Sequence, residues 1–173
     1  MMRRKLIVIL GVLGLCMAVL TACSSQPTKN ADGTPSTLKG RYLGYYRSDT
    51  DNAYYFQENT NEFNFNVQKS TISDGSGDDF YTKKYIVVDE EDLNSELQGE
   101  AQKYKDQISD KDTVFYLVLE DNDVNMDGKV TKSEQQAVYQ SILSNDGENI
   151  KIIALGSIYG YGDDFFFTGT AKE

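Results

Sequence analysis

Oxygen-bearing side chains recur at alternate positions in one short stretch of the chain. Asp123, Asn125 and Asp127 stand at positions 1, 3 and 5 of this stretch, and Glu134 stands at position 12. Calcium takes about six to eight oxygen ligands, so a loop encloses it only when ligands alternate and the chain turns sharply midway. Gly128 at position 6 permits that turn, because it has no Cβ. The spacing therefore predicts a calcium site.

The remaining oxygens of the predicted site come from the backbone and from a hydroxyl group. The carbonyl of Lys129 would bind at position 7, and Thr131 at position 9 would bind directly or through water. Val130 at position 8 would point toward the core. Together these residues resemble an EF-hand loop, and the first half also looks like one half of a dockerin repeat. The resemblance implies that Glu134 completes the site with two oxygens and that a helix follows.

Three features depart from the EF-hand pattern. Gln135 stands where the family usually has an apolar residue, and the segment before the loop is more typical of a strand than of an entering helix. The sequence has no second loop of this kind, although paired loops are the rule in sensors and dockerins. We therefore expect a structural calcium ion. A metal-free interpretation also exists, because Thr131-Lys132-Ser133-Glu134 is itself a helix-capping pattern.

The start of the chain is typical of an export signal. Three basic residues precede an apolar run from Leu6 to Ala22, and Cys23 follows. A basic start, an apolar centre and a small-residue exit predict a signal peptide, residues 1–22. Leu20-Thr21-Ala22-Cys23 resembles the lipobox of bacterial lipoproteins, which implies cleavage before Cys23 once its sulfur carries a diacylglyceryl group. The alternative is an uncleaved signal anchor, since the run approaches the minimum length of a membrane span.

These features predict a protein on the extracytoplasmic face of the cell membrane. We expect a lipidated cysteine and flexible tether, residues 23–37, and a single calcium-binding domain, residues 38–173. Cleavage would remove three basic residues and no acidic one, so the mature chain would be even more acidic than the formal net charge of −10. Such a charge argues against nucleic-acid partners and against a domain that lies flat on an anionic membrane.

The residue types limit the possible chemistry. The chain has no histidine, and the lipoprotein interpretation leaves no free thiol in the mature protein. Histidine-dependent triads and histidine-ligated zinc are therefore excluded. Two classes of function remain: a non-catalytic module that binds an unknown protein or glycan, and a glycan-acting hydrolase of the cell envelope that uses two carboxylates. The many tyrosines and phenylalanines could form the core or line a recognition groove.

The elements that must position the loop are mostly strands. Aromatic, β-branched or alternating runs predict strands at residues 41–46, 53–56, 62–68, 85–88, 113–119, 150–155 and 164–169. A helix is predicted over residues 89–109, because apolar residues recur there at helical spacing: Leu93, Leu97, Ala101, Tyr104 and Ile108. A second helix is predicted over Glu134–Leu143. We therefore expect an α+β fold, with a mostly antiparallel sheet, two helices, and one EF-hand-like loop between a strand (or short helix) and a helix.

Overall fold

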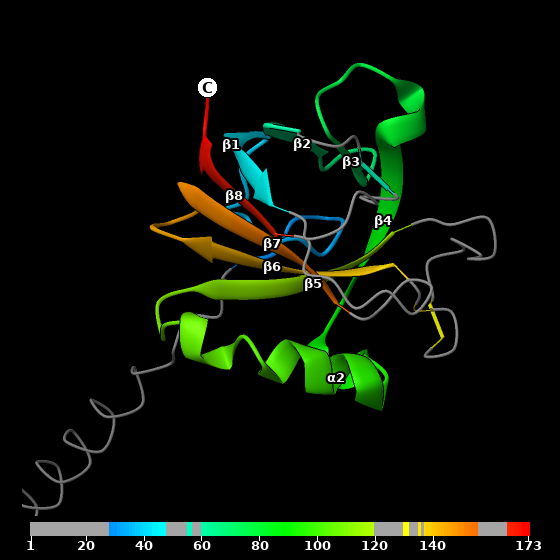
Figure 1. Ribbon diagram of the computed structural model, residues 1–173, viewed down its shortest axis with the longest axis vertical. Coiled ribbons are helices and arrows are strands. Elements are labelled where there is room, and N and C mark those ends of the chain that lie inside the picture. Colours follow the sequence, from blue (N-terminus) through cyan, green and yellow to red (C-terminus); the bar gives the residue numbers. More distant parts are fainter. Residues whose placement is uncertain are drawn as a thin grey trace, which may run out of the picture.

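A computed structural model describes residues 28–47, 55–56, 60–119, 130–131, 135, 137–155 and 166–173. Within these residues, eight antiparallel strands close into a barrel, in which each strand pairs with its neighbours in sequence and the last pairs with the first (Figure 1). The strands are β1 (Arg41–Arg47), β2 (Glu62–Asn66), β3 (Thr71–Ser73), β4 (Thr82–Val88), β5 (Thr113–Leu119), β6 (Val138–Ser144), β7 (Asn149–Leu155) and β8 (Phe166–Ala171). The helical elements are η1 (Asp79–Tyr81), η2 (Glu90–Asp92), α2 (Ser95–Gln102) and η3 (Lys105–Gln107).

The predicted α+β fold with two helices is wrong. The sheet is antiparallel, but it closes on itself, and the described residues contain one α-helix, α2. The helix predicted over Glu134–Leu143 is replaced by strand β6 from Val138 onward. Both faces of β6 are buried, because Tyr139 faces the barrel interior while Ile142 packs beneath α2. A strand buried on both faces shows no polar alternation, so its apolar positions could be matched to a helix.

Two further expectations change in the first half of the chain. Tyr55 and Phe56 lie in a turn and a bend rather than in the predicted strand 53–56, and β2 is the partner of β1. The short strand β3 was not predicted, because three residues are too few to show an alternating pattern. In contrast, the segment before the predicted calcium loop is strand β5, so the short-helix alternative for this segment is wrong.

Aromatic side chains fill much of the barrel interior. Phe63 lies 4.7 Å from both Phe56 and Phe167, measured between ring centroids, in edge-to-face arrangements. Tyr42 is also buried, and its hydroxyl donates to the carbonyl of Gly147 at 2.9 Å. Eight strands enclose a space that side chains can fill completely. These aromatic residues are therefore core, whereas Tyr45 on the outside of β1 is 68% exposed.

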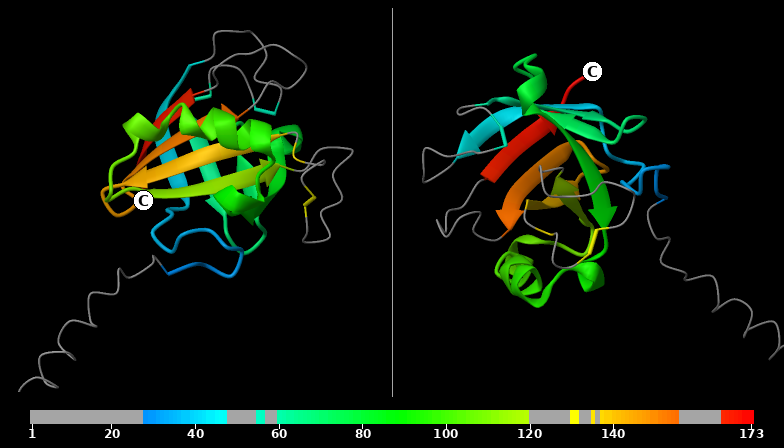
Figure 2. Two further views of the ribbon diagram at one scale, coloured as in Figure 1. Left: turned by 90° about the horizontal axis from the view of Figure 1, so that it is seen from below. Right: turned by 90° about the vertical axis from the view of Figure 1, so that its right-hand side faces the viewer.

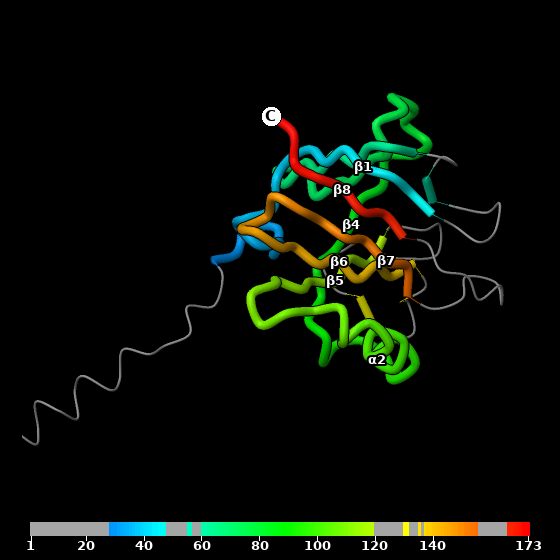
Figure 3. Tube along the Cα trace, turned by 60° about the vertical axis from the view of Figure 1, so that its left-hand side comes forward, coloured from blue at the N-terminus to red at the C-terminus, as the bar shows by residue number. Residues whose placement is uncertain are grey.

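Connections between strands alternate between the two ends of the barrel, because neighbouring strands run in opposite directions. Those that follow β1, β3, β5 and β7 leave from one end, which we call the loop end. Residues 28–38 pack at the other end, which we call the tether end (Figure 3). There Asp32 accepts a hydrogen bond of 2.6 Å from the Tyr85 hydroxyl, and Gly33 lies against Val87. The described part of the predicted tether is thus folded onto the barrel.

The predicted helix over residues 89–109 forms as three shorter pieces, η2, α2 and η3, on the outside of the barrel (Figure 2). Asn94 caps α2, since its side chain accepts a hydrogen bond of 3.0 Å from the backbone N–H of Leu97. The apolar residues predicted for one helix face pack against the outer faces of β5, β6 and β7. In the described part of the chain, no helix has the length and apolar character needed to cross a membrane.

Candidate functional site

Most of the predicted calcium ligands lie outside the described residues. This holds for Asp123, Asn125, Asp127, Lys129 and Glu134, and also for the lipidation residue Cys23. Thr131 is described and is exposed. Among the described residues, no group of three or more acidic or cysteine side chains is arranged to hold a metal ion. Calcium binding therefore stays a prediction.

Two described residues connect the predicted calcium loop to helix α2. Val130, at position 8 of the loop, packs against the apolar cluster beneath α2, as expected for a residue that points toward the core. Gln135, which follows Glu134, is 6% exposed. Its Oε1 accepts from the backbone N–H of Asn94 and its Nε2 donates to the carbonyl of Asp92, both at 2.8 Å. The polar residue that departs from the EF-hand pattern thus satisfies backbone groups at the start of α2.

Replacement of Gln135 by alanine should destabilise the protein by about 2–3 kcal/mol, because two partly buried backbone groups would lose their partner. Denaturant unfolding of wild type and variant measures the change. Gln98→Ala is the matched control, since the Gln98 amide also donates to backbone carbonyls, including that of Leu93 at 3.0 Å, but Gln98 is only half-buried whereas Gln135 is buried. We expect it to cost about 1 kcal/mol or less. Equal costs for the two variants would contradict this role of Gln135.

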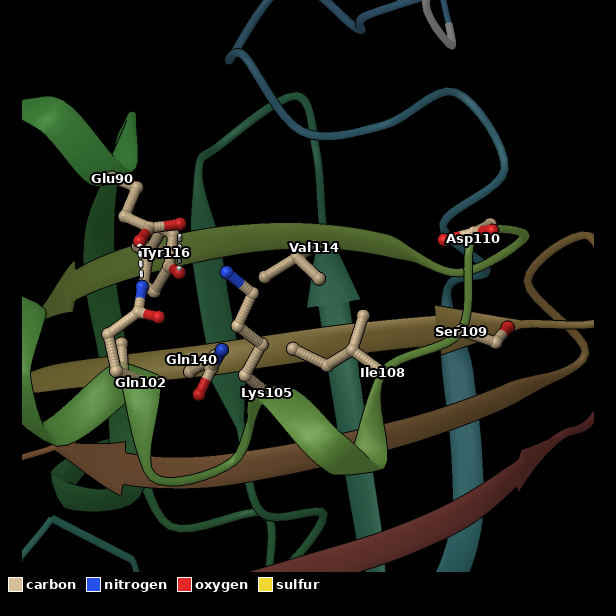
Figure 4. Close-up of a pocket in the computed structure, with 10 residues that line it drawn as sticks. Glu90, Gln102, Lys105, Ile108, Ser109, Asp110, Val114, Tyr116 and Gln140 are labelled. Atoms are coloured by element: carbon tan, nitrogen blue, oxygen red, sulfur yellow. Dashed lines mark hydrogen bonds between the residues drawn. The ribbon is translucent and has the colours of Figure 1, made fainter.

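A cavity of about 290 Å³ lies between the helical segment and the outer face of the barrel (Figure 4). Its floor consists of outward-facing residues of β5 and β6, namely Val114, Tyr116 and Gln140. Residues of η2, α2, η3 and the chain after η3 form the walls and the rim. Tyr116 and Gln140 of the floor are buried and Val114 is half-buried, whereas the polar residues of the rim are exposed. The cavity is therefore open to solvent above a largely buried floor.

Polar groups at one end of the cavity form an ordered chain. The Tyr116 hydroxyl donates to Glu90 Oε2 at 3.2 Å, and Glu90 Oε1 accepts from Gln102 Nε2 at 2.7 Å. Burial and the neighbouring Glu90 carboxylate raise the pKa of Tyr116 above its ordinary value, while a hydrogen bond from Gln140 opposes that shift. Tyr116 therefore remains a neutral phenol that donates to Glu90 and accepts from Gln140.

Gln140 carries a buried polar atom that lacks a hydrogen-bond partner among the described residues. It is 1% exposed, and its Oε1 has no hydrogen-bond partner within the part of the chain that the structure describes. Tyr116 fixes the orientation of the amide, because the phenol oxygen needs a donor and the Gln140 nitrogen supplies it. A buried acceptor without a partner costs about 1–3 kcal/mol, so its presence calls for an explanation.

Sequence reasoning missed this cavity. It assigned Gln140 to the helix predicted over Glu134–Leu143 and Glu90 to the helix predicted over residues 89–109, and gave neither a functional role. One signal was available, the polar pair Gln140-Ser141 inside the otherwise apolar run from Ala137 to Leu143. Polar residues within a buried run often mark a site, but the run does not reveal which residues face them.

Comparison with known proteins leaves the function to be argued from these sites, because no protein-family model, no curated protein and no solved structure matches the chain.

Proposed function

We propose that this protein is a lipid-anchored, extracytoplasmic calcium-binding protein, in which calcium is structural and the barrel is a non-catalytic module for an unknown protein or glycan partner. The observation that carries the proposal is the attachment of Val130 and Gln135 to the α2 region. Val130 belongs to the stretch with calcium-loop spacing, and Gln135 directly follows it. A calcium ion in this stretch would restrain the connection between β5 and β6, and Gln135 would pass that restraint to α2.

The ion would be held by side-chain oxygens and one carbonyl from a single connection. The residues in these roles are Asp123, Asn125, Asp127, Lys129 through its carbonyl, Thr131 and Glu134. Three carboxylates so close in sequence would repel one another without a cation, so the empty loop would be the less stable form. Extracellular calcium modules bind with dissociation constants near about 10⁻⁴–10⁻³ M, and a site of this charge would be filled in that environment.

The topology of the barrel supports an orientation in which the predicted calcium loop points away from the membrane. A lipid on Cys23 would hold the tether end toward the membrane, since residues 28–38 pack there. The connection between β5 and β6 starts and finishes at the loop end. The predicted calcium loop would then face away from the bilayer, together with the connections that follow β1 and β7. A partner in the envelope would meet this end first.

The hydrolase alternative is less well supported. The described cavity carries two carboxylates, Glu90 and Asp110, and both are exposed. A general acid that acts on glycans needs a pKa raised by burial in an apolar setting. Glu90 also accepts a hydrogen bond on each of its carboxylate oxygens, one from Tyr116 and one from Gln102.

Calcium should stabilise the full-length protein, and a chelator should reverse the effect. At about one hundred times the dissociation constant, calcium would add about 2.7 kcal/mol. For a domain of this size, that corresponds to a rise in Tm of about 5–10 °C. Calorimetry of the detergent-solubilised protein with calcium, magnesium or EDTA measures this rise, and isothermal titration measures binding.

Matched variants make this experiment specific. Glu134→Gln should abolish the response to calcium, whereas Asp106→Asn, which changes an exposed carboxylate of η3, should preserve it. Calcium should also slow hydrogen exchange of the α2 amides in wild type, and Gln135→Ala should remove this protection. If calcium neither binds nor raises the Tm of wild type, the proposal is wrong.

A further inference from the structure

The Gln140 side chain defines what can occupy the cavity beneath α2. Its Oε1 is a buried acceptor with no donor among the described residues, although Gln140 lines the cavity. Rotating the amide by half a turn would not help, because the oxygen would then face the Tyr116 oxygen, whose proton goes to Glu90. A molecule that completes this site must therefore bring an N–H or O–H donor and displace the side chains that bury this oxygen.

Opposite charges line the same cavity. Lys105 lies across its middle, close to Val114 and Gln140 in projection, with Glu90 toward one end and Asp110 toward the other (Figure 4). Within the described residues, the Lys105 ammonium has no ion pair, whereas Lys103, two residues earlier, pairs with Glu100 at 2.6 Å. A ligand with both a cationic donor and an anionic group would match these charges.

The rest of the lining is aliphatic. Ala101 is buried, and Ile108 and Val114 are half-buried beneath the mouth of the cavity. A ligand that buries CH₂ groups against such carbon gains affinity through the hydrophobic effect. The volume of about 290 Å³ is at the lower end of small-molecule sites. The cavity therefore suits one compact molecule with a short aliphatic part, and is too small for a glycan chain.

We infer that this cavity binds a small aliphatic α-amino acid in its zwitterionic form. The ammonium group would donate to Gln140 Oε1 and Glu90, the carboxylate would pair with Lys105, and the aliphatic side chain would cover Ile108 and Val114. The inference is argued independently of calcium, because the lining residues that the structure describes all lie outside residues 123–134.

L-Leucine is the probe for this site, titrated calorimetrically into the full-length, detergent-solubilised protein. Two analogues are matched to it: 4-methylpentanoate lacks the ammonium group, and 3-methylbutylamine lacks the carboxylate. We expect saturable binding of leucine and at least tenfold weaker binding of each analogue. No binding of leucine, or equal binding of leucine and 4-methylpentanoate, would overturn the inference.

Variants of the lining assign the binding to the cavity. Gln140→Leu keeps the side chain close to its original size and removes the unpaired acceptor, so the protein should still fold while leucine binds at least tenfold more weakly. Lys105→Gln changes an exposed residue and should also weaken leucine at least tenfold. Lys103→Gln, which changes the lysine outside the cavity, should bind leucine as wild type does.

The two variants also distinguish the loss of a binding contact from the loss of the folded structure. If Gln140→Leu proves unstable, Lys105→Gln decides, because an exposed lysine on the rim contributes little to folding. Wild-type affinity for leucine in Lys105→Gln would show that the amino acid binds elsewhere, and would overturn the inference.

Discussion

Gly44→Ala should destabilise the barrel by about 3 kcal/mol or more, because the new methyl group would collide with backbone. Gly44 faces Gly169 where β1 and β8 close the barrel. A Cβ on Gly44 would overlap the carbonyl oxygen of Thr168 and would stand 2.6 Å from the Cα of Gly169. No change of side-chain rotamer can relieve a collision with backbone, so the two strands would have to separate.

Two other glycines provide controls for this experiment. A Cβ on Gly40 would have its nearest neighbour, the carbonyl oxygen of Phe65, at 3.8 Å, so Gly40→Ala should be nearly neutral. A Cβ on Gly99 meets nothing within 4 Å, and Gly99→Ala should stabilise α2 by about 0.5–1 kcal/mol. Denaturant unfolding followed by circular dichroism gives all three values. If Gly44→Ala is as stable as Gly40→Ala, β1 and β8 are not packed this closely.

The protein should also unfold steeply above about pH 10. Burial raises the pKa of Tyr42 to about 12, and burial is also the main cause of the upward shifts of Tyr85, Tyr116 and Tyr139. An unfolded tyrosine ionises near pH 10. Above that pH the unfolded state releases protons that the folded state keeps, so stability falls as pH rises. Below it, these tyrosines are neutral in both states and add no pH dependence.

The size of this effect follows from the number of buried phenols. Each buried phenol lowers the free energy of unfolding by up to about 1.4 kcal/mol per pH unit, and four together lower it by about 5 kcal/mol per pH unit. Since domains are stable by about 5–15 kcal/mol, the fold should be lost between about pH 11 and 12. Circular dichroism and tyrosinate absorbance, recorded on the same samples, should change together.

Single tyrosine variants test the assignment of the alkaline transition. Tyr139→Phe should make stability fall less steeply with pH, because one buried phenol is removed. Tyr45→Phe should leave the slope unchanged, since Tyr45 is 68% exposed. Full ionisation of all tyrosines near pH 10 with the circular dichroism spectrum intact would contradict the prediction.

Local patterns predicted many of the strands but not the closure of the sheet. The dense β-branched runs at residues 113–119 and 150–155 form β5 and β7, as expected. Closure depends on β1 meeting β8, and in particular on the close approach of Gly44 and Gly169. Neither glycine reveals this alone, because an open sheet and a barrel share the same alternation of inward and outward residues.

The two sites differ in how far a sequence can predict them. The predicted calcium ligands lie within one short stretch, so their spacing is visible without a fold. The same resemblance also led to the wrong helix over Glu134–Leu143, since an EF-hand loop is followed by a helix. The cavity combines Glu90, Tyr116 and Gln140 from three separate elements, and only the pairing of β5 with β6 beneath α2 brings them together.

The pairing of β1 with β8 also sets the order in which a newly made chain can finish folding. β1 pairs with β2 only over Arg41–Leu43, but with β8 over Tyr42–Arg47. Because a chain is synthesised from its N-terminus, β1 is made early and its main partner is made last. Until then β1 exposes an unpaired edge, which can capture a neighbouring chain. The arrival of β8 therefore ends the period in which newly made molecules are most prone to pair with one another.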